Sequence, residues 1–481
     1  MPGFASLFTR ARHGGPDGTK VRWVGWRLVA SCGMLLGVAA AVVAPASAAS
    51  AGGVPAQFWV SQTGLPTGAD RSCPTAAYAT VQSAVLAAEA AETLSPRTIP
   101  TIEICPGTYS EQVTILKSLV LTRAPVAAGL GPVTIQLPAA VGSNQALGLS
   151  TTNCQADDAA QSIQVPQSVI EICSARPGGA NTIGVGVSIN DITVEGNWPT
   201  TVCYDSLYGI LVGGGAALSL TNSTVEQIGA YPLNGCQGGV GVQVGLSPTG
   251  QIGLASLNGD IVETYQKNGI TVDGPGSYGD VVKTAVTGDG PTPAIAQNGI
   301  QFSFGATGSV THAAITGNNY TGTGGASSTG ILVFGGGGSA CGIGPSSPLV
   351  KYATFDDNTL IGNDVGIYLS NVNSTCTKSA TTPTRDTALG NVIQNSHGYP
   401  SADANISGWS AGVGYQAGVS DEGDGDVIWG NAISGAGYAP LGTLPNPLPP
   451  AFARPIDIVS GPAINPQVFG NTYDGMHYNP N

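Results

Sequence analysis

The chain has 481 residues, of which 71 are glycine, 9% are charged and 6% are aromatic, and its net charge is −13. So few charged residues exclude a large helical domain, whose solvent-facing positions would need many Lys, Glu and Arg. The acidic balance argues against a nucleic-acid partner, because phosphate binding needs a basic surface. High glycine content together with many Val, Ile, Thr and Ser favours short strands joined by tight turns.

The amino terminus has the pattern of a secretory signal peptide. Five basic residues precede an apolar run over residues 28–43, and Ala46-Ser47-Ala48 supplies small residues for cleavage. We expect cleavage after Ala48 and a secreted protein with no membrane span in its mature form. A membrane anchor is the alternative, but the apolar run is short for one. Cleavage leaves 11 basic and 28 acidic side chains, a net charge of −17.

A short motif recurs at a nearly constant interval in the middle of the chain. Asn268-Gly269-Ile270-Thr271-Val272 returns over residues 298–302 and again over residues 329–333. Six glycines mark such segments at intervals of 32, 28, 30, 31 and 36 residues: Gly209, Gly241, Gly269, Gly299, Gly330 and Gly366. A fixed period near 30 predicts stacked coils of parallel strands rather than an antiparallel sandwich, which is the alternative.

The start of the mature chain adds a helix to this pattern. Residues 75–92 are rich in alanine and place Val81, Ala84, Val85 and Ala88 on one face, which predicts an amphipathic helix. We expect this helix to cover the first coil, since an uncapped parallel stack exposes a strand edge.

Strand-like segments follow over residues 102–104, 112–115 and 119–122, with a Pro-Gly-Thr-Tyr turn after the first. This order of helix, strand, turn and Glu111-Gln112-Val113-Thr114-Ile115 resembles the opening of the pectin-lyase-like superfamily, and pectin methylesterases in particular. The resemblance covers residues 78–122. It implies an all-β fold, a single-stranded right-handed parallel β-helix with three strands per coil and an N-terminal capping α-helix.

These features predict four segments. They are a signal peptide at residues 1–48, a flexible leader at 49–70, the β-helix with its helical cap at 71–440, and a Pro-rich tail or cap at 441–481.

The cysteines predict disulfide bonds. Eight cysteines remain in the mature chain, and an even number in an exported protein favours disulfides over metal binding. Residues one coil apart are about 4.8 Å apart in a parallel stack, which suits a disulfide. We therefore expect three bonds between neighbouring coils and one closing a local loop: Cys73–Cys105, Cys203–Cys236, Cys341–Cys376 and, within the loop, Cys154–Cys173.

Strand alternation predicts which side chains face solvent. The residues one and three positions after each marker glycine are apolar and should point inward, so the positions between and beyond them should form an outer face. Amides and hydroxyls that bond sugar hydroxyls, and rings that cover sugar faces, recur there. The candidate polysaccharide-binding residues are Gln243, Thr271, Gln301, Ser303, Phe334 and Tyr368. The alternative is an ordinary solvated strand face.

The sequence offers little for catalysis. The resemblance implies two Asp with an Arg and Gln donors in esterases, or Asp-bound Ca²⁺ with an Arg or Lys base in lyases, yet no Arg occurs between Arg176 and Arg385. Asp273, Asp280 and Lys283 are the best candidates for a lyase-like site. Asp is also a common turn residue, so a solvated turn is the simpler interpretation.

One acidic segment could bind a metal. Asp421, Asp424 and Asp426 lie within six residues, and hard cations such as Ca²⁺ prefer oxygen ligands of this kind. The spacing differs from that of an EF-hand because Gly423 falls at a ligand position, and a solvated acidic turn is the alternative. No other cofactor is expected.

The sequence therefore predicts a secreted, monomeric β-helix that binds an extended polysaccharide without strong catalysis. A divergent polysaccharide lyase or carbohydrate esterase, and a structural cell-surface protein, are the alternatives.

Overall fold

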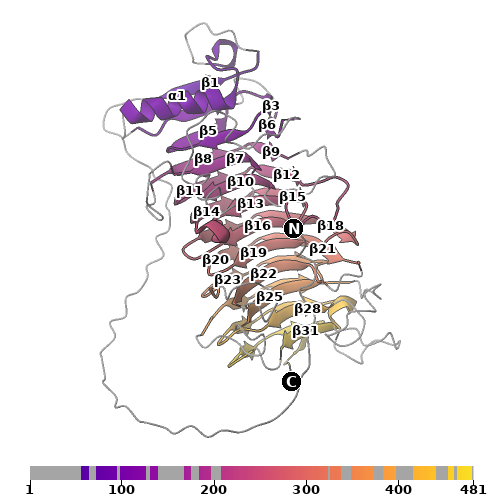
Figure 1. Ribbon diagram of the computed structural model, residues 1–481. Coiled ribbons are helices and arrows are strands. Elements are labelled where there is room, and N and C mark those ends of the chain that lie inside the picture. Colours follow the sequence, from indigo (N-terminus) through magenta and orange to yellow (C-terminus); the bar gives the residue numbers. More distant parts are fainter. Residues whose placement is uncertain are drawn as a thin grey trace, which may run out of the picture.

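In the computed structural model the chain winds into three long parallel sheets stacked around one apolar core (Figure 1). The structure describes residues 56–63, 72–94, 98–125, 131–138, 167–174, 184–196, 207–322, 326–336, 348–372, 383–396, 415–439, 453–459, 463–478 and 480. Each coil contributes one strand to each sheet, so the strand order within a sheet follows the chain in steps of three over most of its length. The chain is a right-handed parallel β-helix, as the sequence predicts.

Sheets A and B have twelve strands each, and sheet C has ten. The strands of sheet A are β1 (Gln57–Val60), β2 (Thr101–Ile104), β5 (Leu119–Arg123), β8 (Gly186–Asn190), β11 (Ala216–Thr221), β14 (Gly253–Asn258), β17 (Tyr278–Val282), β20 (Thr307–Thr311), β23 (Thr354–Asp356), β26 (Thr387–Leu389), β29 (Val427–Trp429) and β32 (Gln467–Phe469). Those of sheet B are β3 (Gly107–Ser110), β6 (Val133–Gln136), β9 (Thr193–Glu195), β12 (Thr224–Ile228), β15 (Ile261–Tyr265), β18 (Ala285–Thr292), β21 (Ala314–Tyr320), β24 (Thr359–Ile361), β27 (Val392–Gln394), β30 (Ala432–Ser434), β33 (Thr472–Tyr473) and β34 (Met476–His477). Those of sheet C are β4 (Val113–Ile115), β7 (Gln167–Cys173), β10 (Leu207–Gly213), β13 (Val240–Val244), β16 (Asn268–Asp273), β19 (Asn298–Ser303), β22 (Thr329–Gly336), β25 (Val365–Val372), β28 (Gln416–Asp421) and β31 (Ala453–Ile458).

The helix α1 (Val81–Leu94) lies across the first coil (Figure 1). The apolar face predicted from the sequence is buried, with Val81, Ala84, Val85 and Ala88 all fully covered. The start of the helix is fixed by Glu111, whose carboxylate accepts hydrogen bonds from the N–H groups of Val81 and Gln82 at 2.8 and 2.9 Å. A carboxylate is well placed there because a helix amino terminus carries unpaired donors and a positive dipole end.

The marker glycines lie in one column because the backbone leaves no room for a side chain. A Cβ built on Gly209, Gly241, Gly269, Gly299 or Gly330 would stand 2.5–2.7 Å from the carbonyl oxygen of the next glycine in the column. The column continues from Gly366 to Gly418, a glycine that the sequence repeat did not reach. Steric exclusion at this position therefore explains the repeat.

Asparagines form a second column at the start of the sheet B strands. Asn358 donates its side-chain N–H to the Oδ1 atom of Asn391, Asn391 donates to Asn431, and Asn431 donates to Asn471, at 2.8–3.0 Å. The same Oδ1 atoms accept backbone N–H groups of the preceding coil, as between Asn358 and Ala313. The asparagine side chains therefore bond one another from coil to coil and accept backbone N–H groups at the corners.

Two of the expected segment boundaries are wrong. Residues 57–60 lie in the predicted leader, yet β1 pairs in parallel with β2 and so belongs to sheet A. Residues 441–481 were expected to leave the helix, but β31, β32 and β33 pair with β28, β29 and β30. The β-helix thus gains a coil at this end because apolar strand residues recur beyond the Pro-rich stretch.

The structure contains the predicted disulfide between Cys73 and Cys105, whose Cα atoms are 5.7 Å apart. It joins η1 (Cys73–Thr75) to the end of β2. Cys173 and Cys236 are also disulfide-bonded. Their expected partners Cys154 and Cys203, and the pair Cys341–Cys376, lie outside the described residues.

Candidate functional site

Sheet C presents one position from each coil to its outer face, and strand pairing places these positions in a single row. The register of the strands places these residues side by side, with neighbours about 4.8 Å apart. From the first coil to the last, the row consists of Thr114, Glu171, Leu211, Gln243, Thr271, Gln301, Leu332, Tyr368, Ser420 and Asp457. The inward positions on either side, such as Ile270 and Val272, are fully buried, so the predicted alternation is correct.

Much of this row is nevertheless covered, which corrects the expectation that it faces solvent. Gln243 and Thr271 are each only 4% exposed, and Ser303 is fully buried. Leu246, at the start of the turn after β13, packs over the outer face with Tyr208 in a small apolar cluster. Gln243 is further tied to the backbone, since its Nε2 donates to the Gly245 carbonyl at 2.8 Å.

A hydrogen-bonded ladder runs beside the row. The Nδ2 of Asn298 donates to Oδ1 of Asn268 at 2.9 Å, and the Thr329 hydroxyl donates to Oδ1 of Asn298 at 2.8 Å. The amides of Asn268 and Asn298 also reach Oε1 of Gln301 at 3.2 and 3.4 Å. Because these groups hold one another, they form a fixed polar network, in which Asn268 and Asn298 are only 6% and 5% exposed and Gln301 is half-buried.

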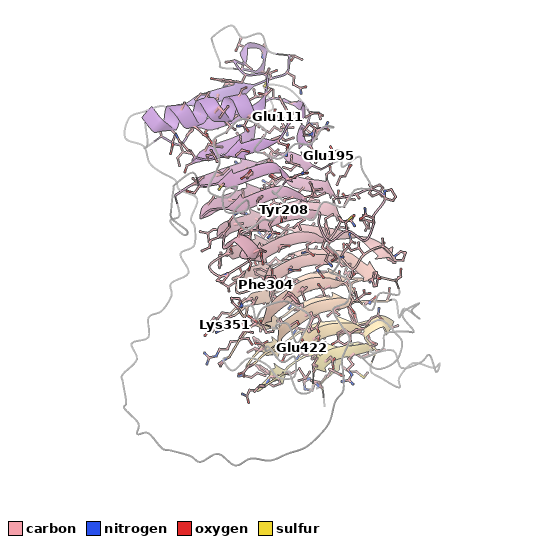
Figure 2. The ribbon with its side chains drawn as sticks, viewed as in Figure 1. Glu111, Glu195, Tyr208, Phe304, Lys351 and Glu422 are labelled. Carbon is pink, nitrogen blue, oxygen red and sulfur yellow. A yellow bond between two sulfur atoms is a disulfide. The ribbon has the colours of Figure 1, made fainter. Side chains whose placement is uncertain are left out.

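Aromatic side chains occupy the more open part of the face. Phe304 and Phe334 pack edge to face with ring centroids 5.5 Å apart, and both are half-buried. Phe304 lies just beyond β19 on the outside of the solenoid (Figure 2). Tyr368 is half-buried on the neighbouring strand, in register with Leu332. We call Phe304, Phe334 and Tyr368 the aromatic strip.

Two buried carboxylates lie at the C-terminal end of the same face. Glu422 accepts hydrogen bonds from the hydroxyls of Tyr368 and Ser370, both at 3.0 Å, and burial raises its pKa to about 7. It lies at the end of β28 (Figure 2).

The second carboxylate, Asp457, lies on the adjacent strand β31. It accepts from the Tyr415 hydroxyl at 2.7 Å and pairs with Arg454 at 3.0 Å. The Glu422 carboxyl is therefore about half protonated at neutral pH, while Asp457 is held by a guanidinium.

Sequence reasoning missed both residues. Glu422 was part of the acidic turn considered only for metal binding. Asp457 was in the segment expected to leave the helix. Asp457 could have been found only by recognising residues 453–458 as a further strand of the β-helix.

The three catalytic candidates are not brought together. Asp273 lies on β16 in sheet C, where its Oδ2 accepts the Ser247 N–H at 2.7 Å and its Oδ1 accepts the Ser303 hydroxyl at 2.8 Å. Burial raises its pKa to about 6. Asp280 lies on β17 in sheet A and accepts a hydrogen bond from Ser309, and Lys283 is exposed at the following corner. The structure therefore gives these residues separate roles in the coils.

The acidic turn is not the solvated segment that was the alternative to a metal site. Asp421 and Asp426 are fully buried, and both have one carboxylate oxygen without a hydrogen-bond donor. Burial and their mutual proximity raise the pKa of Asp421 well above its usual range. Asp424 is half-buried, and its charge contributes to the raised pKa of Asp426. Within the described residues, no group of three Asp, Glu, His or Cys side chains is arranged to hold a metal ion.

No protein-family model matches this chain, and no curated protein sequence matches it. Among solved structures, the Dettilon tailspike protein is similar at 13% identity and a TM-score of 0.43, covering 86% of this chain and 66% of that one, just under two thirds. XylC in complex with xylose is similar at 10% identity and a TM-score of 0.43, covering 79% and 69%. DFA-IIIase from Arthrobacter chlorophenolicus A6 without its lid, in complex with GF2, has 10% identity and a TM-score of 0.40, covering 87% and 99%. Likeness at this level says nothing about a ligand or a reaction.

In the part of the chain that the structure describes, no helix has the length and apolar character needed to span a membrane.

Proposed function

We propose that the mature protein is exported and, as a monomer, binds an extended polysaccharide along the outer face of sheet C. The observation that carries this proposal is the aromatic strip, whose rings are half-buried on the outside of consecutive coils next to the Asn–Gln ladder. Aromatic rings offer flat apolar surfaces to sugar faces, and neighbouring amides supply hydrogen bonds to hydroxyls.

The geometry of the solenoid suits a polymer. Successive coils repeat about every 4.8 Å, which is close to the length of one sugar unit in an extended chain. A polysaccharide lying along the solenoid axis would therefore meet an equivalent position on each coil. The net charge of −17 after removal of residues 1–48 favours a neutral polymer on this face over a polyanion such as pectate.

Affinity electrophoresis of the purified mature protein through gels containing neutral or anionic polysaccharides tests this proposal. We expect retention by a neutral polymer and loss of retention in the double variant Phe304→Ala/Phe334→Ala. Phe469→Ala, which removes a half-exposed ring from sheet A, is the matched control and should be retained like the natural protein. If no polymer retains the natural protein, the structural surface protein is the better interpretation.

Export has a separate test. Sequencing the amino terminus of protein recovered from the medium should begin at Ala49, directly after the expected cleavage site. Retention of the protein in the membrane fraction would contradict this part of the proposal.

A divergent carbohydrate-cleaving enzyme is the second candidate, and the pair Glu422 and Asp457 favours it. A carboxyl with a pKa of about 7 can donate a proton at neutral pH, and the Asp457 carboxyl group on the next strand would be the second acidic residue of such a site. Released reducing ends, unsaturated ends or methanol would reveal hydrolase, lyase or esterase activity. Such activity should disappear in Glu422→Gln, while retention on the polymer persists.

A further inference from the structure

Two tyrosine rings lie side by side at the C-terminal end of the sheet C face. Tyr368 is the last ring of the aromatic strip, and the ring centroid of Tyr415 is 6.1 Å from its own. Both side chains are half-buried. The Tyr415 hydroxyl bonds to Ser420 at 2.6 Å and to Asp457 at 2.7 Å, and both partners belong to the outer row of sheet C. The aromatic surface therefore continues from Tyr368 onto the next coil.

Glu422 holds the first of these rings. Its Oε1 accepts the Tyr368 hydroxyl and its Oε2 accepts the Ser370 hydroxyl, both at 3.0 Å. The Glu422 side chain is 3% exposed, so each oxygen depends on the hydroxyl that faces it. A hydrogen bond to an ionised carboxylate is about twice as strong as one between neutral groups. The ionised form of Glu422 therefore fixes the Tyr368 ring most firmly.

Asp457 holds the second ring in a different way. While its Oδ2 accepts the Tyr415 hydroxyl, its Oδ1 pairs with the Arg454 guanidinium at 3.0 Å. An arginine keeps its charge throughout the neutral range of pH. Asp457 thus has a permanent cationic partner, and its bond to Tyr415 does not depend on a change of protonation near neutral pH.

Glu422 has no such partner, since none of the ion pairs among the described residues includes it. The other titratable groups that face it are Tyr368 on β25 and Asp457 on β31, and Asp421 directly precedes it on β28. Burial, with a further contribution from the charge of Asp457, raises the pKa of Glu422 to about 7. Glu422 therefore exchanges a proton near neutral pH while it lies against Tyr368.

Protonation changes what Glu422 can offer its two neighbours. The added hydrogen turns one carboxylate oxygen into a donor, yet both oxygens face hydroxyl donors, from Tyr368 and Ser370. One of these hydroxyls then has to turn round and accept. The charge-assisted bond to Tyr368 is lost in either arrangement, which leaves its ring fixed less firmly than that of Tyr415.

We propose that Tyr368 and Tyr415 bind the polysaccharide together, and that Glu422 is a positioning residue whose ionisation strengthens this binding. The inference rests on the proposed binding of a neutral polysaccharide by sheet C and adds its regulation by pH. Tyr415 contributes a further ring to the aromatic strip. Glu422 does not touch the sugar and acts through the Tyr368 hydroxyl.

Affinity electrophoresis in gels of a neutral polysaccharide, at about pH 6 and about pH 8, tests the proposal on either side of the Glu422 pKa. The natural protein should bind about threefold more tightly at the higher pH, where Glu422 is ionised. Glu422→Gln imitates the protonated carboxyl and should bind at both pH values as the natural protein does at the lower one. Tyr368→Phe keeps the ring without its hydroxyl and should also lose the pH dependence.

Tyr415→Ala tests the added ring and should weaken binding several-fold at both pH values. Glu263→Gln is the control for Glu422→Gln, because it makes the same chemical change at a half-buried glutamate on the outer face of sheet B. It should keep the natural pH dependence. Unchanged binding in Tyr415→Ala, or a natural pH dependence in Glu422→Gln, would overturn the proposal.

A measurement without ligand separates this inference from the proposed function. The near-ultraviolet circular dichroism of the tyrosines should change between the two pH values in the natural protein, and this change should be smaller in Glu422→Gln and in Tyr368→Phe. Retention that does not vary with pH would refute the regulation and leave polysaccharide binding intact. If no neutral polymer retains the natural protein at either pH, both the proposed function and this inference fail.

Discussion

Gly269 lies directly against Gly299, so that a Cβ on Gly269 would stand 2.6 Å from the Gly299 carbonyl oxygen and 2.6 Å from a Val286 methyl group. Gly269 has no unusual backbone angle, so crowding alone excludes a side chain there. The same contact recurs between successive coils from Gly209 to Gly418. This contact between glycines limits how closely successive strands of sheet C can approach each other.

Gly269→Ala should therefore destabilise the protein by about 2 kcal/mol or more, because overpacking a closed site forces backbone shifts. Gly186→Ala is the matched control, since a Cβ there meets nothing within 4 Å. Chemical denaturation of both variants measures the free energies of unfolding. Equal loss in the two variants would show that glycine is needed for some reason other than contact with the next coil.

Asp260 occupies the position that Asn358 holds in a later coil. Both accept a backbone N–H of the preceding coil through Oδ1, from Ser223 at 2.8 Å and from Ala313 at 2.9 Å. Asn358 also donates through Nδ2 to the Val310 carbonyl, whereas the second oxygen of Asp260 is buried without a donor. Burial raises the pKa of Asp260 to about 7.

Asp260→Asn should stabilise the protein at pH 8, since its amide can donate to the Leu220 carbonyl as Asn358 donates to Val310. The natural carboxyl stabilises the fold fully only below its unfolded pKa of about 4, and that contribution is lost as the pH rises through about 7. The stability difference between variant and natural protein should thus grow by a few kcal/mol from pH 4 to pH 8. Thermal unfolding at several pH values measures it, and a difference independent of pH would contradict the prediction.

The regular parts of the fold could be predicted because each coil repeats the same physical constraint. The clash at Gly269 and the burial of Ile270 and Val272 recur at the next coil, so they leave a period in the sequence. The segments that cover the outer face leave no such period in the sequence, because they differ between coils. Leu246, in the turn after β13, packs with Tyr208, Leu211 and Val240, and no pattern in the sequence indicated this contact.

The roles of Glu422 and Asp457 could not be predicted from the sequence for a related reason. Gly366 and Gly418 are neighbours in the column but 52 residues apart, so an insertion breaks the period just before Glu422. Asp457 follows another long connection. Contacts between coils joined by such insertions depend on register, which only the structure supplies.

The capping of α1 by Glu111 gives a third prediction. Glu111→Ala removes acceptors from the Val81 and Gln82 N–H groups and should cost about 1–2 kcal/mol, the usual loss for a helix cap. Glu111→Gln keeps one acceptor oxygen and should cost less. Hydrogen exchange of peptides that cover residues 81–94 measures the effect locally. If exchange there is unchanged in Glu111→Ala, the helix is held by its buried face alone.

Asp421 and Asp426 give the last prediction. Oδ1 of Asp426 accepts from the Thr384 hydroxyl at 2.6 Å and from the Asp386 N–H at 2.8 Å, so its unpartnered Oδ2 is the atom left to interact with Asp421. The pKa of each carboxyl is raised, first by burial, so the pair resists losing both of its protons. Deprotonating both would leave two buried like charges, so the natural protein should lose stability as the pH rises.

Asp426→Asn places an N–H donor where the shared proton lies. It should raise the midpoint of thermal unfolding, and this gain should grow as the pH rises, because only the natural pair then loses its protons. Asp357→Asn is the control, because it makes the same chemical change at an exposed carboxylate outside the pair. Added calcium chloride extends the test: a rise in the unfolding temperature of the natural protein that Asp426→Asn abolishes would show that a cation, rather than a proton, holds the two carboxylates together.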